Sequence, residues 1–335
     1  MANKNDKKKN HHYVYGNYLK PWMNEKNEVF YLSKKKNISS DSVKSILKED
    51  YFYKIKGFSE LELEIILLTI KKAHPRIAKK HIEFLVKIIQ VLVKEHNQKV
   101  NVVSDPVAER ELDIEKSNTV ENMHCEHENK SLPILNLLRN GNVDCLNNDN
   151  YAYDFYLYIG QQIARTKNFR ELSKIFSELN TDASLDDTIE AVQNCWWFLC
   201  YILGTNLGLS LYESRSKMTK TLLINKTSLP FITSDQPVVS LIENTNPDVS
   251  FSANSFDLYY PLSPSHAIVI SEKKYFKSGV VKITKSKVDE LNRNIAMQSR
   301  NTIITNNPDL VLEYKRLLGT RLKGFMDYAK NNSVK

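Results

Sequence analysis

Short apolar and β-branched runs separated by polar turns occupy the beginning of the chain, a pattern that predicts strands. Residues 29–32 follow a polar turn and form one expected strand, and residues 50–55 form a second. Residues 1–10 are polar and rich in lysine and asparagine, so we expect a disordered basic tail there. The ordered part of the chain should therefore begin near residue 11.

Apolar residues recur at helical spacing from residue 59 onward. Ser59 has the residue type of a helix N-cap, and Pro75 is expected to begin a second helix. Residues 97–131 hold few large apolar side chains, so they are predicted to form a long surface loop or a mobile insertion. Helical spacing resumes from Pro133. Residues 59–220 are therefore expected to form a helical subdomain.

The pattern changes again after Lys220, where short β-like runs alternate with turn residues. The expected strands are residues 222–224, 231–233, 237–239, 257–260, 267–270 and 302–304. A helix is predicted over 285–299 and a final helix over 310–328. We predict an α+β fold, with a helical middle region packed on a mostly antiparallel C-terminal sheet that the N-terminal strands join. A single domain over 11–330, with its β-rich part at 221–306, is expected.

Composition and charge narrow the functional classes. The chain has 335 residues, of which 41% are hydrophobic, as in ordinary soluble globular proteins. Its net charge of +8 favours an anionic partner, most simply nucleic acid or nucleotide, although a Lys- and Asn-rich composition also follows from an AT-rich genome. Four cysteines without Cys-x-x-Cys spacing fit a reducing cytoplasm. No signal peptide is evident and the longest apolar run, residues 195–203, is too short to span a bilayer, so no membrane association is expected.

The first candidate for chemistry is the adjacent pair His11 and His12, which Tyr13 follows in a polar, basic segment. Histidine titrates near neutral pH and serves as a general acid, a general base or a metal ligand. Ser234 and Asp235 form a second candidate, because a turn with proline after a strand fixes a hydroxyl and a carboxylate at a sheet edge. An ordinary Ser or Asx turn explains the same two residues.

Other polar residues extend this candidate set. Arg300 suits bidentate anion binding or a surface salt bridge, and Asn294 lies on the helix before it. Ser263 lies between two prolines in a turn that is structural when taken alone. Together the histidines, Asp235 and Arg300 have the residue types of a phosphodiester-cleaving site. The sequence has no Gly-rich phosphate loop, no zinc-protease helix motif and no nucleophile elbow.

Four motifs in this order resemble one family, the bacterial domain of unknown function numbered 4238. Its members open with His-His-Tyr-Val-Pro-Gln-x-Tyr-Leu, which residues 11–19 follow except that Tyr-Gly replaces Pro-Gln. The family's Gln-x-x-Arg-Thr helix is similar to residues 162–166, which include Gln162 and Arg165. Its Ser-Asp-x-Pro-Val turn is similar to residues 234–238, and its Phe/Tyr-Pro-Leu-Ser-Pro turn to residues 260–264.

The resemblance implies a bacterial or mobile-element origin and a toxin-like effector encoded among defence genes. Our hypothesis is a cytoplasmic nuclease that acts in phage defence by abortive infection. The residues expected to act catalytically are His11, His12, Ser234 and Asp235. The residues expected to contact the substrate are Tyr13, Gln162, Arg165, Ser263, Asn294 and Arg300.

Two alternatives stay open at the level of sequence. The first is a non-catalytic subunit that binds nucleic acid or a protein partner. The second is an enzyme that modifies or senses nucleotides, which would need a closed pocket. A divalent metal is compatible with the residue set, but the sequence identifies neither the cofactor nor the oligomeric state.

Overall fold

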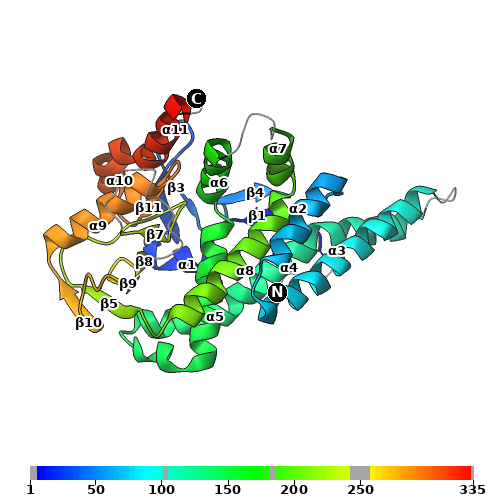
Figure 1. Ribbon diagram of the computed structural model, residues 1–335. Coiled ribbons are helices and arrows are strands. Elements are labelled where there is room, and N and C mark those ends of the chain that lie inside the picture. Colours follow the sequence, from blue (N-terminus) through cyan, green and yellow to red (C-terminus); the bar gives the residue numbers. More distant parts are fainter. Residues whose placement is uncertain (1–5, 101–104, 181–185, 242–256, 333–335) are drawn as a thin grey trace.

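The computed structural model of the protein describes residues 6–100, 105–180, 186–241 and 257–332. Helices fill one end of the molecule and surround a small sheet of β1 and β4, and the two larger sheets lie at the other end with the three last helices (Figure 1). The helices are α1 Gly16–Leu19, α2 Glu60–Lys71, α3 Pro75–Val100, α4 Pro106–Arg139, α5 Asp149–Ala164, α6 Lys167–Asn180, α7 Asp186–Asn194, α8 Trp196–Ser214, α9 Lys285–Gln298, α10 Pro308–Tyr314 and α11 Thr320–Asn332. Among these described residues, no helix is both long enough and apolar enough to cross a membrane.

The strands form three sheets. They are β1 Asn10–His12, β2 Glu28–Leu32, β3 Ile38–Ser42, β4 Lys48–Asp50, β5 Thr219–Asn225, β6 Thr233–Ser234, β7 Val239–Ser240, β8 Asp257–Ser263, β9 His266–Ser271, β10 Gly279–Ile283 and β11 Ile303–Thr305. The largest sheet has the order β10-β5-β9-β8-β7 and is antiparallel except where β10 pairs with β5.

The N-terminal strands join the C-terminal ones, as expected. The second sheet has the order β3-β2-β11-β6 and is antiparallel throughout. Strands β1 and β4 form a separate antiparallel ribbon of two strands. The α+β fold, with its helical middle and mostly antiparallel sheets, is therefore confirmed.

The prediction of a loop over residues 97–131 is wrong. Helix α3 continues to Val100, and residues 106–131 belong to α4, whose N-cap Asp105 accepts hydrogen bonds from two backbone N–H groups of the first turn. Helices α3 and α4 lie side by side and project from the body of the molecule (Figure 1). The segment misled the sequence rules because α4 buries polar side chains: Ser117, Asn118, Thr119, Glu121, His124, Glu128 and Ser131. Pro133 lies inside α4 instead of starting a helix.

The expected disordered tail is wrong for residues 6–10, while residues 1–5 lie outside the described residues. The backbone N–H of Lys8 donates to Asn118 of α4 at 2.8 Å, and Lys7 forms an ion pair with Asp113 at 2.5 Å. Asn10 already pairs with β4. The basic N-terminal segment therefore packs against the helix that the sequence rules read as a loop.

Two other element boundaries differ from expectation because of residues with positive φ. The strand expected over residues 50–55 ends at Asp50, since Tyr51 has φ of 56° and the chain turns there. The final helix is interrupted between α10 and α11, where Gly319 has φ of 69°. A Cβ atom on Gly319 would also lie 2.9 Å from the carbonyl oxygen of Arg300.

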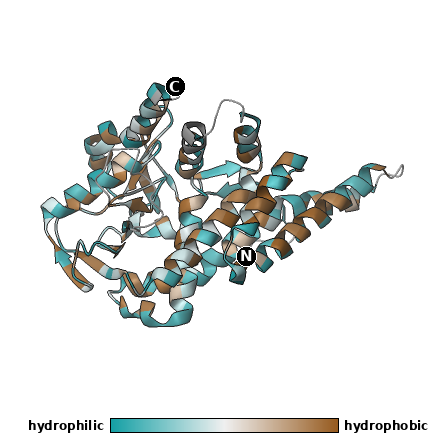
Figure 2. Ribbon diagram, in the orientation of Figure 1, coloured by the Kyte–Doolittle hydropathy of each residue, from teal (hydrophilic) through white to brown (hydrophobic). Residues whose placement is uncertain are grey.

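The two most buried helices, α5 and α8, cross in the middle of the molecule at three glycines. Apolar colouring is continuous along α8 (Figure 2). A Cβ atom on Gly160 of α5 would lie 2.2 Å from the carbonyl oxygen of Gly204 and 2.4 Å from the backbone nitrogen of Gly208, both in α8. Such distances are far below van der Waals contact, so the backbones can approach this closely only without side chains.

This packing gives a stability prediction. Gly160→Ala should destabilise the protein by ~3 kcal/mol or more, because the added methyl group meets backbone that cannot move aside alone. The matched control is Gly324→Ala in α11, where a Cβ atom has no neighbour within 4 Å. The free energy of unfolding of that variant should rise by ~0.5–1 kcal/mol, because alanine has a higher helix propensity than glycine. Equal effects of the two substitutions in chemical denaturation would contradict the account.

Candidate functional site

The four sequence motifs are connected to one another in space. Gln162 donates a side-chain hydrogen bond to the carbonyl oxygen of Tyr13 at 3.3 Å, which joins the first two motifs. The hydroxyl of Thr166 donates to the side chain of Gln236, which joins the second to the third. The hydroxyl of Tyr18 donates to the carbonyl oxygen of Pro261 at 2.8 Å, which joins the first to the fourth. Segments far apart in sequence therefore share one interior network.

Five of the polar residues in this region gather around one arginine, and we call the six residues together the Arg165 cluster. Its members are His12 of β1, Glu121, His124 and Glu128 of α4, Gln162 of α5, and Arg165 at the C-cap of α5. The three α4 residues have the spacing i, i+3 and i+7, which places them on one face of the helix. The structure thus brings together three of the expected site residues, His12, Gln162 and Arg165.

Arg165 forms a buried ion pair with Glu128. The side chain of Arg165 is 2% exposed and that of Glu128 is 9% exposed. Burial raises the pKa of Glu128, and the positive charge of Arg165 opposes that rise. Burial also works against the charged form of Arg165, but the attraction to Glu128 keeps its pKa above the ordinary value. Each ion is tolerated in the interior because the other is there.

Glu121 is a second buried carboxyl beside this pair. Burial, followed by repulsion from Glu128, raises its pKa to about 8, whereas Arg165 and Lys8 act in the opposite direction. The backbone N–H of His12 donates a hydrogen bond to this carboxyl group. Glu121 is therefore largely protonated at neutral pH and can donate a proton.

The two histidines of the cluster are neutral at pH 7. Burial lowers the pKa of His12, nearby Arg165 lowers it further, and a hydrogen bond with the backbone of Lys44 opposes both. Burial also holds the pKa of His124 well below its ordinary value, and its ring lies 4.5 Å from that of Tyr53. Within the described residues, Nε2 of His12 and both ring nitrogens of His124 lack hydrogen-bond partners. Nε2 of His12 thus makes no hydrogen bond with the described residues, while the backbone N–H of the same residue binds the protonated carboxyl of Glu121.

His11 is placed differently from its neighbour. Its Nδ1 accepts a hydrogen bond from the backbone N–H of Tyr53 at 2.9 Å, so its Nε2 carries the proton and donates to the carbonyl oxygen of Lys8 at 3.1 Å. Its ring stacks on that of Tyr53, and burial lowers its pKa to about 4. Because both nitrogens already bind backbone, His11 holds β1 in place.

Asp235 belongs to a second group of polar residues. Its carboxylate accepts hydrogen bonds from the backbone N–H groups of Arg300 and Asn301, each at 2.8 Å, while burial raises its pKa to about 6. Burial and then the charge of Asp235 raise the pKa of Tyr13, so the phenol and the carboxylate are neighbours. The guanidinium of Arg300 pairs with Glu171 at 3.2 Å. In the described part of the chain, no hydrogen bond or ion pair joins Asp235 to either His11 or His12.

Three expected site residues serve turns and packing. The hydroxyl of Ser234 donates to the carbonyl oxygen of Gln236 at 2.8 Å, as in an ordinary serine turn. Ser263 accepts from the backbone N–H of His266 at 3.0 Å in the β8–β9 turn. Asn294 donates to the carbonyl oxygen of Ser240 at 2.9 Å and so ties α9 to β7.

Lysines border both groups of polar residues. Lys8 lies with its ammonium 2.6 Å from the side-chain oxygen of Asn122, and its charge lowers the pKa of Glu121. The charge of Lys48 in β4 lowers the pKa of His12. The ammonium of Lys167 lies 5.0 Å from the ring centroid of Tyr13. Lys167 also forms an ion pair with Glu49, so its charge is partly compensated within the chain.

Sequence reasoning missed the acidic half of the cluster. Glu121, His124 and Glu128 lie in the segment that was expected to form a loop. Their i, i+3, i+7 spacing could have identified one polar helix face, but polar helix faces are usually solvated. Across the described ranges, no group of three or more His, Cys, Asp or Glu side chains is placed to hold a metal ion.

The fold and this network define an α+β protein in which hydrogen bonds connect four separated motifs and two of these motifs contribute to a buried polar cluster. The model of the family described as "Protein of unknown function (DUF4238)" matches residues 10–309, and the chain belongs to this family. Comparison with curated proteins and with solved structures gives no match.

The buried ion pair leads to a second prediction. Glu128→Gln leaves Arg165 charged and unpaired in the interior, so the free energy of unfolding should fall by ~3–5 kcal/mol. The control is Glu126→Gln on the same helix, whose exposed ion pair with Lys130 at 2.8 Å should be worth at most ~0.5 kcal/mol. Chemical denaturation measures both. Similar losses in the two variants would show that the pair is not buried as described.

The raised pKa of Glu121 gives a third prediction. The folded protein retains this proton up to a pH of about 8, whereas the unfolded chain loses it near the ordinary glutamate pKa of 4.5. Stability from this group is therefore present at low pH and lost as the pH rises through that window. Glu121→Gln should remove this pH-dependent loss of stability. Between pH 5 and pH 8.5 the free energy of unfolding of the variant should therefore rise by on the order of 2–4 kcal/mol relative to wild type.

Denaturation at a series of pH values tests this, with Glu111→Gln as the control. Glu111 lies on the same helix and is exposed, so its substitution should leave the pH profile unchanged. Parallel profiles for wild type and Glu121→Gln would mean that Glu121 is ionised in the folded protein.

Proposed function

We propose that the protein cleaves phosphodiester bonds in nucleic acid and that the Arg165 cluster supplies the acid–base chemistry. The observation that carries the proposal is the pairing of a protonated carboxyl, Glu121, with a neutral imidazole, His12, in one cluster. Groups with such complementary protonation states at neutral pH are characteristic of acid–base catalysis.

Each residue then has a chemical role. Nε2 of His12 takes a proton from the attacking hydroxyl or water, and Glu121 gives its proton to the oxygen that leaves phosphorus. Lys8 and Lys48 bind the flanking phosphates, and Arg165 supplies positive charge close to the reacting group. His11 positions β1, and the group of Tyr13, Asp235 and Arg300 contacts the substrate farther from the reacting bond.

Access to the cluster involves the β1–β4 ribbon, which carries His12 and Lys48. A ribbon of only two strands has little stability of its own. Because His11 fixes β1 to the backbone of Lys8 and Tyr53, a substrate reaches the cluster only when these two hydrogen bonds open. We extend the proposal to an effector of phage defence in the bacterial cytoplasm, which rests on the motif resemblance alone.

A second candidate function is a nucleic-acid-binding subunit without turnover. It is favoured by the way His11 and Asp235 are saturated with backbone hydrogen bonds, as in residues that only maintain structure. In that case the lysines near the cluster bind the backbone of the nucleic acid and no bond is cleaved.

A cleavage assay tests the proposal. The protein is incubated with single-stranded RNA and with DNA, with and without Mg²⁺ or Mn²⁺, and products are separated by size. We expect cleavage that falls by roughly 10²-fold or more in His12→Gln and in Glu121→Gln. The control, His74→Gln, changes a histidine whose side chain is 43% exposed and should retain activity.

The outcomes separate the two candidate functions. Cleavage that persists in both cluster variants would refute the proposed site. Binding without cleavage, weakened in Lys8→Gln and Lys48→Gln with a reduced salt dependence, would identify the binding subunit instead.

A further inference from the structure

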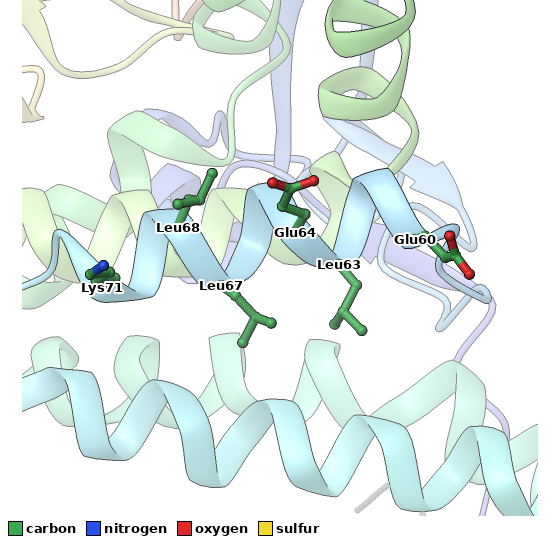
Figure 3. A pocket seen from close by; sticks show the side chains of 6 residues that line it. All are labelled: Glu60, Leu63, Glu64, Leu67, Leu68 and Lys71. Atoms are coloured by element: carbon green, nitrogen blue, oxygen red, sulfur yellow. The ribbon is translucent and has the colours of Figure 1, made fainter.

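The outer face of α2 carries leucines that the protein leaves in solvent. Leu67 is 43% exposed and Leu68 is 49% exposed. With Leu63 they line a shallow groove on α2. Leu63 and Leu67 point toward the neighbouring helix, whereas Glu64 and Leu68 point to the other side of α2 (Figure 3). Helix α3 carries further exposed apolar side chains at coiled-coil spacing: Ile82, Val86, Ile89 and Val93. Exposed apolar side chains gathered in this way mark an interaction site.

Charges are distributed unevenly along the same groove. Glu60 and Glu64 line it toward the N-terminus of α2, and Lys71 lines it at the C-terminal end. The leucines lie between these two ends. Within the described residues, Glu60, Glu64 and Lys71 form no ion pair. Along α2 the face is therefore acidic at one end, apolar in the middle and basic at the other end. Its three charged side chains lack an ion-pair partner within the described residues.

This order makes the face complementary to itself in one orientation. A twofold axis brings the same surface of two molecules together. If one residue of the first copy contacts a second residue of the other copy, the reverse contact forms as well. Antiparallel packing of two α2 helices places Glu60 and Glu64 of one copy beside Lys71 of the other, with leucines between. Antiparallel helices also bring opposite ends of their dipoles together. A parallel pair would instead place like charges opposite each other.

We propose that a second copy of this chain covers the groove, through antiparallel packing of α2 on α2 about a twofold axis. The exposed stripe of α3 extends the apolar contact on either side. The dimer uses a surface separate from the Arg165 cluster, so it does not depend on the proposed catalytic role.

Sedimentation velocity and light scattering over a range of protein concentrations test the dimer. We expect a dimer for wild type and a monomer for Leu67→Glu/Leu68→Glu, with circular dichroism showing that the helices are retained. The control is Leu312→Glu on α10, a residue that is 48% exposed and lies at the opposite end of the molecule (Figure 1). It should remain dimeric. A monomeric wild type, or a dimer that survives the double substitution, would overturn the proposal.

A charge exchange tests the antiparallel orientation. Lys71→Glu should raise the dimer dissociation constant by roughly tenfold, since it places a third negative charge against two others. Adding Glu64→Lys in the same chain gives one contact of opposite charges on each side of the axis, while Glu60 still repels the substituted position 71, so it should recover part of the affinity. High salt should weaken the wild-type dimer. Failure of the second substitution to rescue the first would overturn the antiparallel arrangement.

Discussion

The interior of this protein depends on the ion pair between Arg165 and Glu128. Two ions buried together are stable only with close contact and additional hydrogen bonds, so the position of α4 against the end of α5 is tightly constrained. Burial is the main reason why Glu121, His12 and His124 are neutral, and the pair adds to it. The charge of Glu128 further disfavours a second carboxylate at Glu121, and the charge of Arg165 further disfavours protonated His12 and His124.

The motif residues are divided between this cluster and the framework that holds it. Gln162 and Arg165 belong to the cluster, whereas Tyr18 stacks on Tyr260 with ring centroids 4.9 Å apart and joins the N-terminal segment to the large sheet. His11 fixes β1 through the backbone, and His12 next to it faces the cluster. Adjacent residues of a single motif can therefore serve different purposes. Asp235 fixes the chain before β11 in a similar way, through two backbone N–H groups.

Much of the fold could be predicted because alternation and helical spacing report which side chains are buried. Strands β5 to β9, strand β11 and helix α9 follow that rule, and the N-cap Ser59 begins α2 as expected. Strand β10 was not predicted, because it buries no side chain completely. Helix α4 breaks the rule, because its buried face holds carboxyl, imidazole and hydroxyl groups. Glu128 pairs with Arg165, and the buried hydroxyls of α4 donate to carbonyl oxygens of the helix itself. No periodicity of apolar residues can reveal such a face. The missed half of the candidate site lies there for the same reason.

The protonation of Glu121 is the central claim, since both the energetics and the proposed chemistry require a neutral carboxyl beside His12. Its pKa can be measured directly by carbon-13 NMR of glutamate carboxyl groups, with the resonance assigned by its loss in Glu121→Gln. The account predicts a titration midpoint near the value of about 8 that burial and Glu128 impose. A midpoint near 4.5, the ordinary pKa of a glutamate carboxyl group, would contradict it.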